Sequence, residues 1–115
     1  MDKKPETLIK LEKMLDCYAK ELGKLRDFNI SNTRAKKLRE LYESYTESPY
    51  DMNFIIDRAG DFLGGRLLLA GGGPTVWLDT KKAELIGIWG ETITKPVIVP
   101  DCISDFLEDQ YELTK

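Results

Sequence analysis

The sequence predicts a single α+β domain spanning residues 1–115, and three observations predict it. Leucines recur at three- and four-residue spacing near the N-terminus, which is typical of an amphipathic helix. From residue 64 onward, short apolar runs alternate with glycine and lysine turns, and connections this short require antiparallel strands. An acidic, amphipathic stretch closes the chain. The expected order is therefore a helical hairpin over 1–48, an antiparallel sheet of three to four strands over 64–100 and a terminal helix over 101–113.

The first expected helix covers residues 6–27 and begins beside Pro5, where a missing backbone N–H costs nothing. Its apolar side chains follow a heptad spacing and form one stripe. Two interpretations remain open: the stripe packs on the protein's own core, or it forms the seam of a homodimer. The residues of this candidate seam are Leu8, Leu11, Leu15, Tyr18, Leu22 and Leu25.

A second helix is expected over residues 33–47, capped by Ser31 or Asn32 and ended by Pro49. A short turn between two amphipathic helices predicts an antiparallel helical hairpin. The following stretch, 50–63, fits either a short helix or a strand, and its composition slightly favours a short strand or an irregular segment.

The sheet is expected to contain strands at 66–70, 75–80, 85–89 and 96–99. The glycines before Pro74 predict a turn with positive φ. Both tryptophans are interpreted as core aromatics that lie near each other across the hairpin. Asp101 or Ser104 is expected to cap the terminal helix.

The composition argues against most catalytic and metal-binding chemistries. The chain has no histidine, and its two cysteines cannot build a structural zinc site of the usual kind, so they are expected to be free thiols. The glycine run lacks the lysine and the following helix that a phosphate-binding loop needs. Asp79 and Glu91 bracket the hairpin, but nothing in the sequence brings the two carboxylates together. We therefore expect no enzyme activity, no cofactor and no metal.

The charges are unevenly distributed along the chain, although the net charge is only −3. Residues 1–39 carry an excess of lysine and arginine, whereas 40–61 and 91–115 are acidic. The basic stretch Arg34–Arg39 could contact nucleic acid, but the low pI and the acids that follow it disfavour this interpretation. No apolar run has the length of a membrane span, and the N-terminus lacks a secretory signal, so a cytoplasmic location away from membranes is expected.

One pattern resembles a known group of proteins. A strand of the form GGPxVWxD at Gly72–Asp79, a GxWG return at Gly87–Gly90 and an acidic helix at 103–112 are similar to small open reading frames of bacterial plasmids, phages and integrative elements. The resemblance covers about residues 64–112. It implies a setting in which small acidic proteins inhibit host defence, as antirestriction and anti-CRISPR proteins do, by occupying a basic nucleic-acid groove on the defence enzyme.

The sequence thus predicts a non-catalytic inhibitor that binds a protein with a basic groove, such as a nuclease effector, through acidic patches. The alternative is an accessory or regulatory protein that self-associates through the Leu8–Leu25 seam as a homodimer. The candidate partner-binding residues are Asp101, Asp105, Glu108, Asp109, Glu112, Glu43, Glu47 and Asp51.

Overall fold

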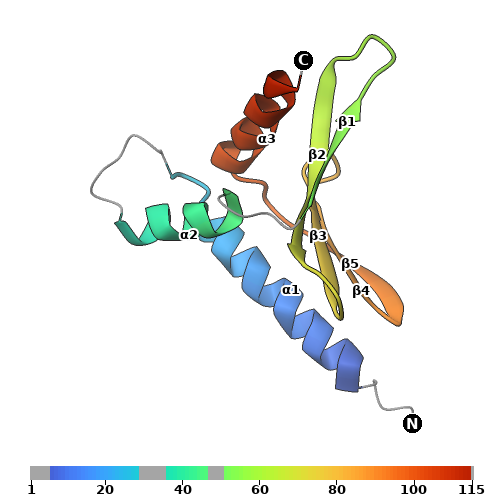
Figure 1. Ribbon diagram of the computed structural model, residues 1–115. Helices are drawn as coiled ribbons and strands as arrows, with labels where there is room; N and C mark the ends of the chain where they lie inside the picture. The colour runs from blue at the N-terminus through green and yellow to red at the C-terminus, as the bar shows by residue number, and fades with distance from the viewer. Residues whose placement is uncertain (1–5, 29–35, 47–50, 115) are drawn as a thin grey trace.

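The computed structural model describes residues 6–28, 36–46 and 51–114 and confirms the α+β class (Figure 1). Two helices precede an antiparallel sheet of five strands, and a third helix follows it. The elements are α1 (Glu6–Lys24), α2 (Lys36–Thr46), β1 (Met52–Ile56), β2 (Phe62–Ala70), β3 (Thr75–Asp79), β4 (Glu84–Trp89), β5 (Glu91–Pro96) and α3 (Asp101–Leu113).

The sheet is a meander in which each strand pairs with the next one along the chain, in the order β1-β2-β3-β4-β5. The expectation of three to four strands was therefore too low. The ambiguous stretch 50–63 contributes β1 and the start of β2. The last strand lies at Glu91–Pro96 and not at 96–99, because Gly90, with a φ of 79°, lets the chain turn immediately after Trp89. Pro96 ends the strand, since it has no N–H to donate.

All three helices lie on one face of the sheet, which we call the inner face (Figure 1). Helix α1 covers β4, α3 covers β2, and α2 packs against α3. Gly87 allows the close approach of α1, because a Cβ atom there would lie 2.9 Å from Leu11 Cδ1. At Gly65 an added Cβ atom would lie 3.5 Å from Leu107 Cδ1, which is an ordinary van der Waals distance, so α3 packs on β2 without depending on this glycine.

The core lies between the helices and the inner face. Leu11, Leu22 and Leu25 have no exposed surface, and Leu15 is only 2% exposed. From Leu11 onward the apolar stripe therefore packs within the chain, as in the first of the two interpretations left open by the sequence, whereas Leu8 is half-buried and does not belong to this core. The buried partners of the stripe on the sheet and on α3 are Leu67, Val76, Leu78, Leu85, Ile103 and Leu107.

Helix α2 contacts α1 through Tyr45. Its hydroxyl donates to Glu21 Oε1 at 3.2 Å, and its ring meets that of Tyr18 edge-on, with centroids 6.3 Å apart. The two helices thus meet in the second half of α1, and α2 packs mainly against α3. The expected hairpin is present only in this limited sense. Its expected capping residues, Ser31 and Asn32, lie outside the described residues.

Two further expectations were wrong. Trp77 pairs with Ile86, and because side chains alternate along a strand, Trp89 points to the opposite face. The tryptophans therefore do not lie together: Trp89 packs against the core, while Trp77 is on the outer face. At α3 the N-cap position belongs to Pro100, with no capping side chain, so neither Asp101 nor Ser104 has that role.

Candidate functional site

The acidic residues of α3 border a groove between α2 and α3, of about 440 Å³. We call it the α2–α3 groove. Its acidic side is a stripe of aspartates spaced by four residues, which places them on one line along the helix. Aromatic side chains from both α2 and α3 also line the groove. The lining residues are Phe28, Tyr42, Asp101, Cys102, Asp105, Phe106 and Asp109.

The three aspartates of the groove are exposed, and none of them forms an ion pair with another described residue. Asp101 belongs to the first turn of α3, where a carboxylate is stabilised by the helix dipole. Asp105 and Asp109 lie further along, where the helix dipole gives little compensation. The negative charge of the groove is therefore met mainly by solvent.

This charge acts on the neighbouring titratable groups. Burial raises the pKa of Tyr42, and the negative charges of Cys102, Asp109 and Asp105 raise it further. Burial also raises the pKa of the Cys102 thiol, against two backbone hydrogen bonds that lower it, and Asp105 and Asp101 add to the increase. Both shifts favour the neutral forms of the Tyr42 phenol and the Cys102 thiol beside the negatively charged aspartates. A cation bound in the groove would offset this negative potential.

The aromatic side chains of the groove complete its chemistry. The rings of Phe28 and Tyr42 pack at a centroid distance of 5.4 Å, and Phe106 follows Cys102 by four residues on α3. Carboxylates beside aromatic faces form the combination that binds lysine and arginine side chains, through charge-assisted hydrogen bonds and cation–π contacts. Only the acidic part of the site was predicted from the sequence, although the four-residue spacing of Cys102 and Phe106 repeats that of the aspartates.

The other predicted acidic residues are distributed around this groove. Glu108 and Glu112 are exposed on α3 outside its lining, and Glu43 is half-buried on α2. Asp51 precedes β1, where its carboxylate accepts a hydrogen bond from the backbone N–H of Met52 at 2.8 Å. Glu47 lies outside the described residues. The structure therefore gathers the acids of α3 and leaves Asp51 on a different element.

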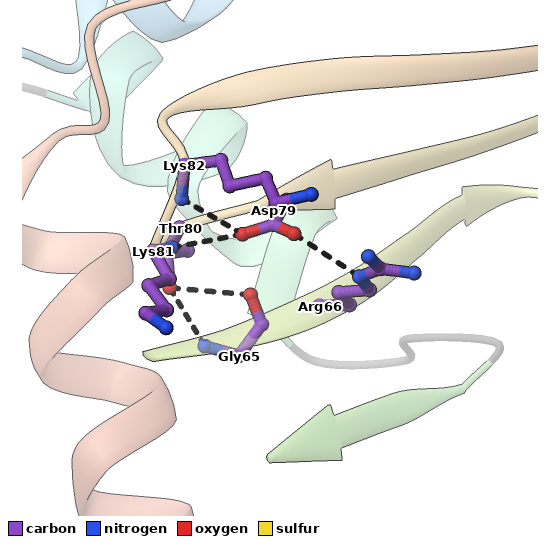
Figure 2. A network of polar contacts seen from close by, with 6 residues as sticks. All are labelled: Gly65, Arg66, Asp79, Thr80, Lys81 and Lys82. Carbon is purple, nitrogen blue, oxygen red and sulfur yellow. Dashed lines mark hydrogen bonds and ion pairs between the residues drawn. The ribbon is translucent and has the colours of Figure 1, made fainter. Parts of the chain in front are cut away.

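A second polar cluster surrounds Asp79, a charged side chain with no exposed surface (Figure 2). Its Oδ1 accepts backbone hydrogen bonds from Lys81 at 3.0 Å and Lys82 at 2.9 Å, and its Oδ2 accepts Arg66 Nε at 3.1 Å. Both oxygens are thus used in holding the β3–β4 turn to β2. Glu91 lies at the other end of β4, so the two carboxylates that bracket the hairpin are not brought together.

The residues behind the other candidate chemistries lie at separate places in the described part of the chain. No three His, Cys, Asp or Glu residues converge there to hold a metal ion. Cys17 is exposed, Cys102 is half-buried, and both are free thiols, as expected. Of the basic stretch, Lys36 and Lys37 are exposed on α2, and Arg34 is outside the described residues. None of the helices formed by the described residues is long and apolar enough to cross a membrane.

Comparison with family models, with curated proteins and with solved structures finds no match for this chain.

Proposed function

We propose that this chain is a non-catalytic interaction protein that binds a basic surface of another protein through the α2–α3 groove. The observation that supports this proposal is the stripe of Asp101, Asp105 and Asp109, which is exposed, has no ion-pair partner among the described residues and faces aromatic rings. The resemblance to mobile-element proteins extends the proposal to a class of partner, a host defence nuclease whose nucleic-acid groove the protein would block.

The energetics favour a binding role for these acids. Like charges three or four residues apart on a helix repel by a few tenths of a kcal/mol per pair, so the density of acids on α3 costs stability. Arginine or lysine side chains of a partner would remove that repulsion and add charge-assisted hydrogen bonds. Because the net charge is only −3, the proposed contact is a local acidic groove and not a surface that mimics DNA throughout.

The test combines affinity capture with a charge reversal. The tagged protein is used to capture partners from a bacterial lysate, and mass spectrometry identifies the proteins retained. The variant Asp105→Lys/Asp109→Lys should bind the captured nuclease at least about tenfold more weakly, or about 1.4 kcal/mol, and the loss should shrink at high salt. The purified nuclease should cleave DNA more slowly when the wild-type protein is present.

The matched control is Asp61→Lys/Glu91→Lys, which makes the same charge change at two exposed acids outside the groove. It should bind and inhibit as the wild type does. Equal binding by the groove variant and the wild type at low salt would place the contact surface elsewhere. Capture of proteins that lack any nucleic-acid-binding activity would contradict the nuclease assignment.

A further inference from the structure

The outer face of the sheet carries an apolar patch that no described element covers (Figure 1). Leu68, Trp77 and Ile86 form a continuous row across β2, β3 and β4, and Ile88 lies beside it with 40% of its surface exposed. None of these four side chains belongs to the core or packs against it. An antiparallel sheet with one solvated face normally carries polar residues there, so this row is unusual for a face in contact with water.

The neighbouring row on the same face consists of three charged residues, one on each of β2, β3 and β4. Arg66 on β2 pairs with Asp79 on β3, which in turn pairs with Glu84 on β4. A cation and an anion therefore flank the central strand at equal distance. The apolar row has the same layout, with Leu68 and Ile86 on either side of Trp77.

We propose that the outer face binds a second copy of this chain, face to face, about a two-fold axis that runs along β3. Such an axis places β2 of one copy opposite β4 of the other. Arg66 then faces Glu84 of the second copy, and Leu68 faces its Ile86. Each contact occurs twice, as in any isologous interface. The charge pattern of one copy is thus complementary to that of a second copy related by the two-fold axis. This self-complementarity is why we infer a second copy as the partner of this face.

The two charged groups are available for this contact. Arg66 donates its Nε to Asp79, and its side chain keeps 41% of its exposure, so the terminal nitrogens of the guanidinium can reach another carboxylate. Glu84 is half-buried and has no ion-pair partner among the described residues. Asp79 already has partners for both oxygens within its own chain, so it enters the interface satisfied.

The area of the face is sufficient for a weak specific dimer. Five strands about 4.8 Å apart and about 20 Å long give a footprint of roughly 480 Å² for each copy. Two copies together therefore bury about 1,000 Å², the lower limit for a specific interface. Two sheets stacked about 10 Å apart, with their strands within about 30° of each other, would interdigitate the apolar rows as sandwich cores do.

Sedimentation equilibrium of the whole chain tests this proposal. The wild type should dimerise reversibly within concentrations up to about 1 mM, because an interface near the lower size limit is typical of weak, transient complexes. Glu84→Arg places arginines opposite each other and should raise the dimer dissociation constant at least tenfold. Glu91→Arg makes the same charge change on β5 outside the charged row and should leave the constant unchanged.

A second variant tests the apolar row. Ile86→Lys should give a monomer whose circular dichroism and denaturation midpoint stay close to those of the wild type, because Ile86 is not part of the core. Ile98→Lys, at an apolar residue that is 56% exposed outside the strands, should remain dimeric. A wild type that stays monomeric throughout the concentration range overturns the proposal. So does a dimer that neither Glu84→Arg nor Ile86→Lys weakens.

Discussion

Both faces of the sheet carry apolar side chains, but the helices pack on only one of them. On the inner face, Leu67, Val76 and Leu78 lose all their exposed surface under α1 and α3. On the outer face, Leu68, Trp77 and Ile86 are equally apolar but only half-buried, with no described element over them. An apolar row that helices cover contributes to the core. An apolar row that stays exposed marks an interaction site or promotes aggregation. Among the described residues, helices therefore cover the inner face of the sheet and nothing covers the outer one.

The polar side chains reinforce this contrast. On the inner side, hydrogen bonds tie elements together, as when Tyr111 donates to the carbonyl of Gly60. On the outer face, the Arg66–Asp79 pair stabilises a turn and also leaves part of the guanidinium open to solvent. The outer face therefore combines a hydrogen-bonded turn with a partly exposed guanidinium.

The largest expected difference between the faces comes from two adjacent leucines of β2. Leu67→Ala removes a fully buried side chain and should cost about 2–5 kcal/mol of unfolding free energy, because a cavity remains in the core. Leu68→Ala, one residue later on the outer face, should cost below about 1 kcal/mol at concentrations where the protein is monomeric. Urea denaturation of both variants measures the difference. Equal losses would mean that the outer row is covered in solution.

A smaller effect is expected at the polar row. Asp79→Ala removes a charged acceptor of three hydrogen bonds and leaves two backbone N–H groups of the turn without that partner. The loss should be about 1.5–3 kcal/mol, the range for hydrogen bonds to charged groups. Asp79→Asn keeps one acceptor oxygen and should therefore lose less unfolding free energy than Asp79→Ala. If both variants unfold at the wild-type midpoint, the network does not hold the turn.

Much of the fold could be predicted from local signals. The period of the leucines located α1, the glycine and lysine turns located β2 to β4, and Pro100 marked the start of α3. These features are set by residues close together in sequence. The fifth strand was misplaced because the turn at Gly90 is too short to leave a visible loop between β4 and β5. The cover of each face depends on long-range packing, and therefore local patterns could not show it.

The pattern that suggested a family is largely explained by the fold itself. Gly72, with a φ of 105°, turns the chain, and Val76 and Leu78 fill the core. The Asp79 carboxylate accepts hydrogen bonds from the backbone of the next turn, and Gly87 leaves room for the Leu11 side chain. Each of these residues therefore has a structural role within the sheet and its turns. The candidate groove arises instead from α2, α3 and Phe28, which are distant in sequence, so only its acidic half could be predicted.

The inner face should also be less tolerant of added volume than exposed positions are. A Cβ atom at Gly65 would lie 2.7 Å from the backbone oxygen of Asn53 on β1, which cannot move without disturbing the strand pair. Gly65→Ala should therefore destabilise the protein by about 1–3 kcal/mol.

Gly23→Ala is the matched control for this substitution. The site is exposed on α1, nothing lies within 4 Å of an added Cβ, and alanine favours the helix by up to about 1 kcal/mol. It should stabilise the protein slightly in the same urea titration. A neutral Gly65→Ala would show that β1 can separate from β2 at little cost.

The smallest effect concerns the helical layer over the inner face and appears only at alkaline pH. Burial raises the pKa of Tyr45 well above its ordinary value of 10.0, and the negative charge and hydrogen bond of Glu21 raise it further. The folded state thus keeps the phenol protonated while the unfolded chain ionises. The stabilisation is complete below pH 10 and is lost as pH rises above it, by up to about 1.4 kcal/mol per pH unit.

Between pH 8 and pH 11, Tyr45→Phe should therefore lose about 1 kcal/mol less unfolding free energy than the wild type. Urea titrations of both proteins at each pH measure this, and equal pH dependence would mean that the Tyr45 phenol reaches solvent in the folded protein.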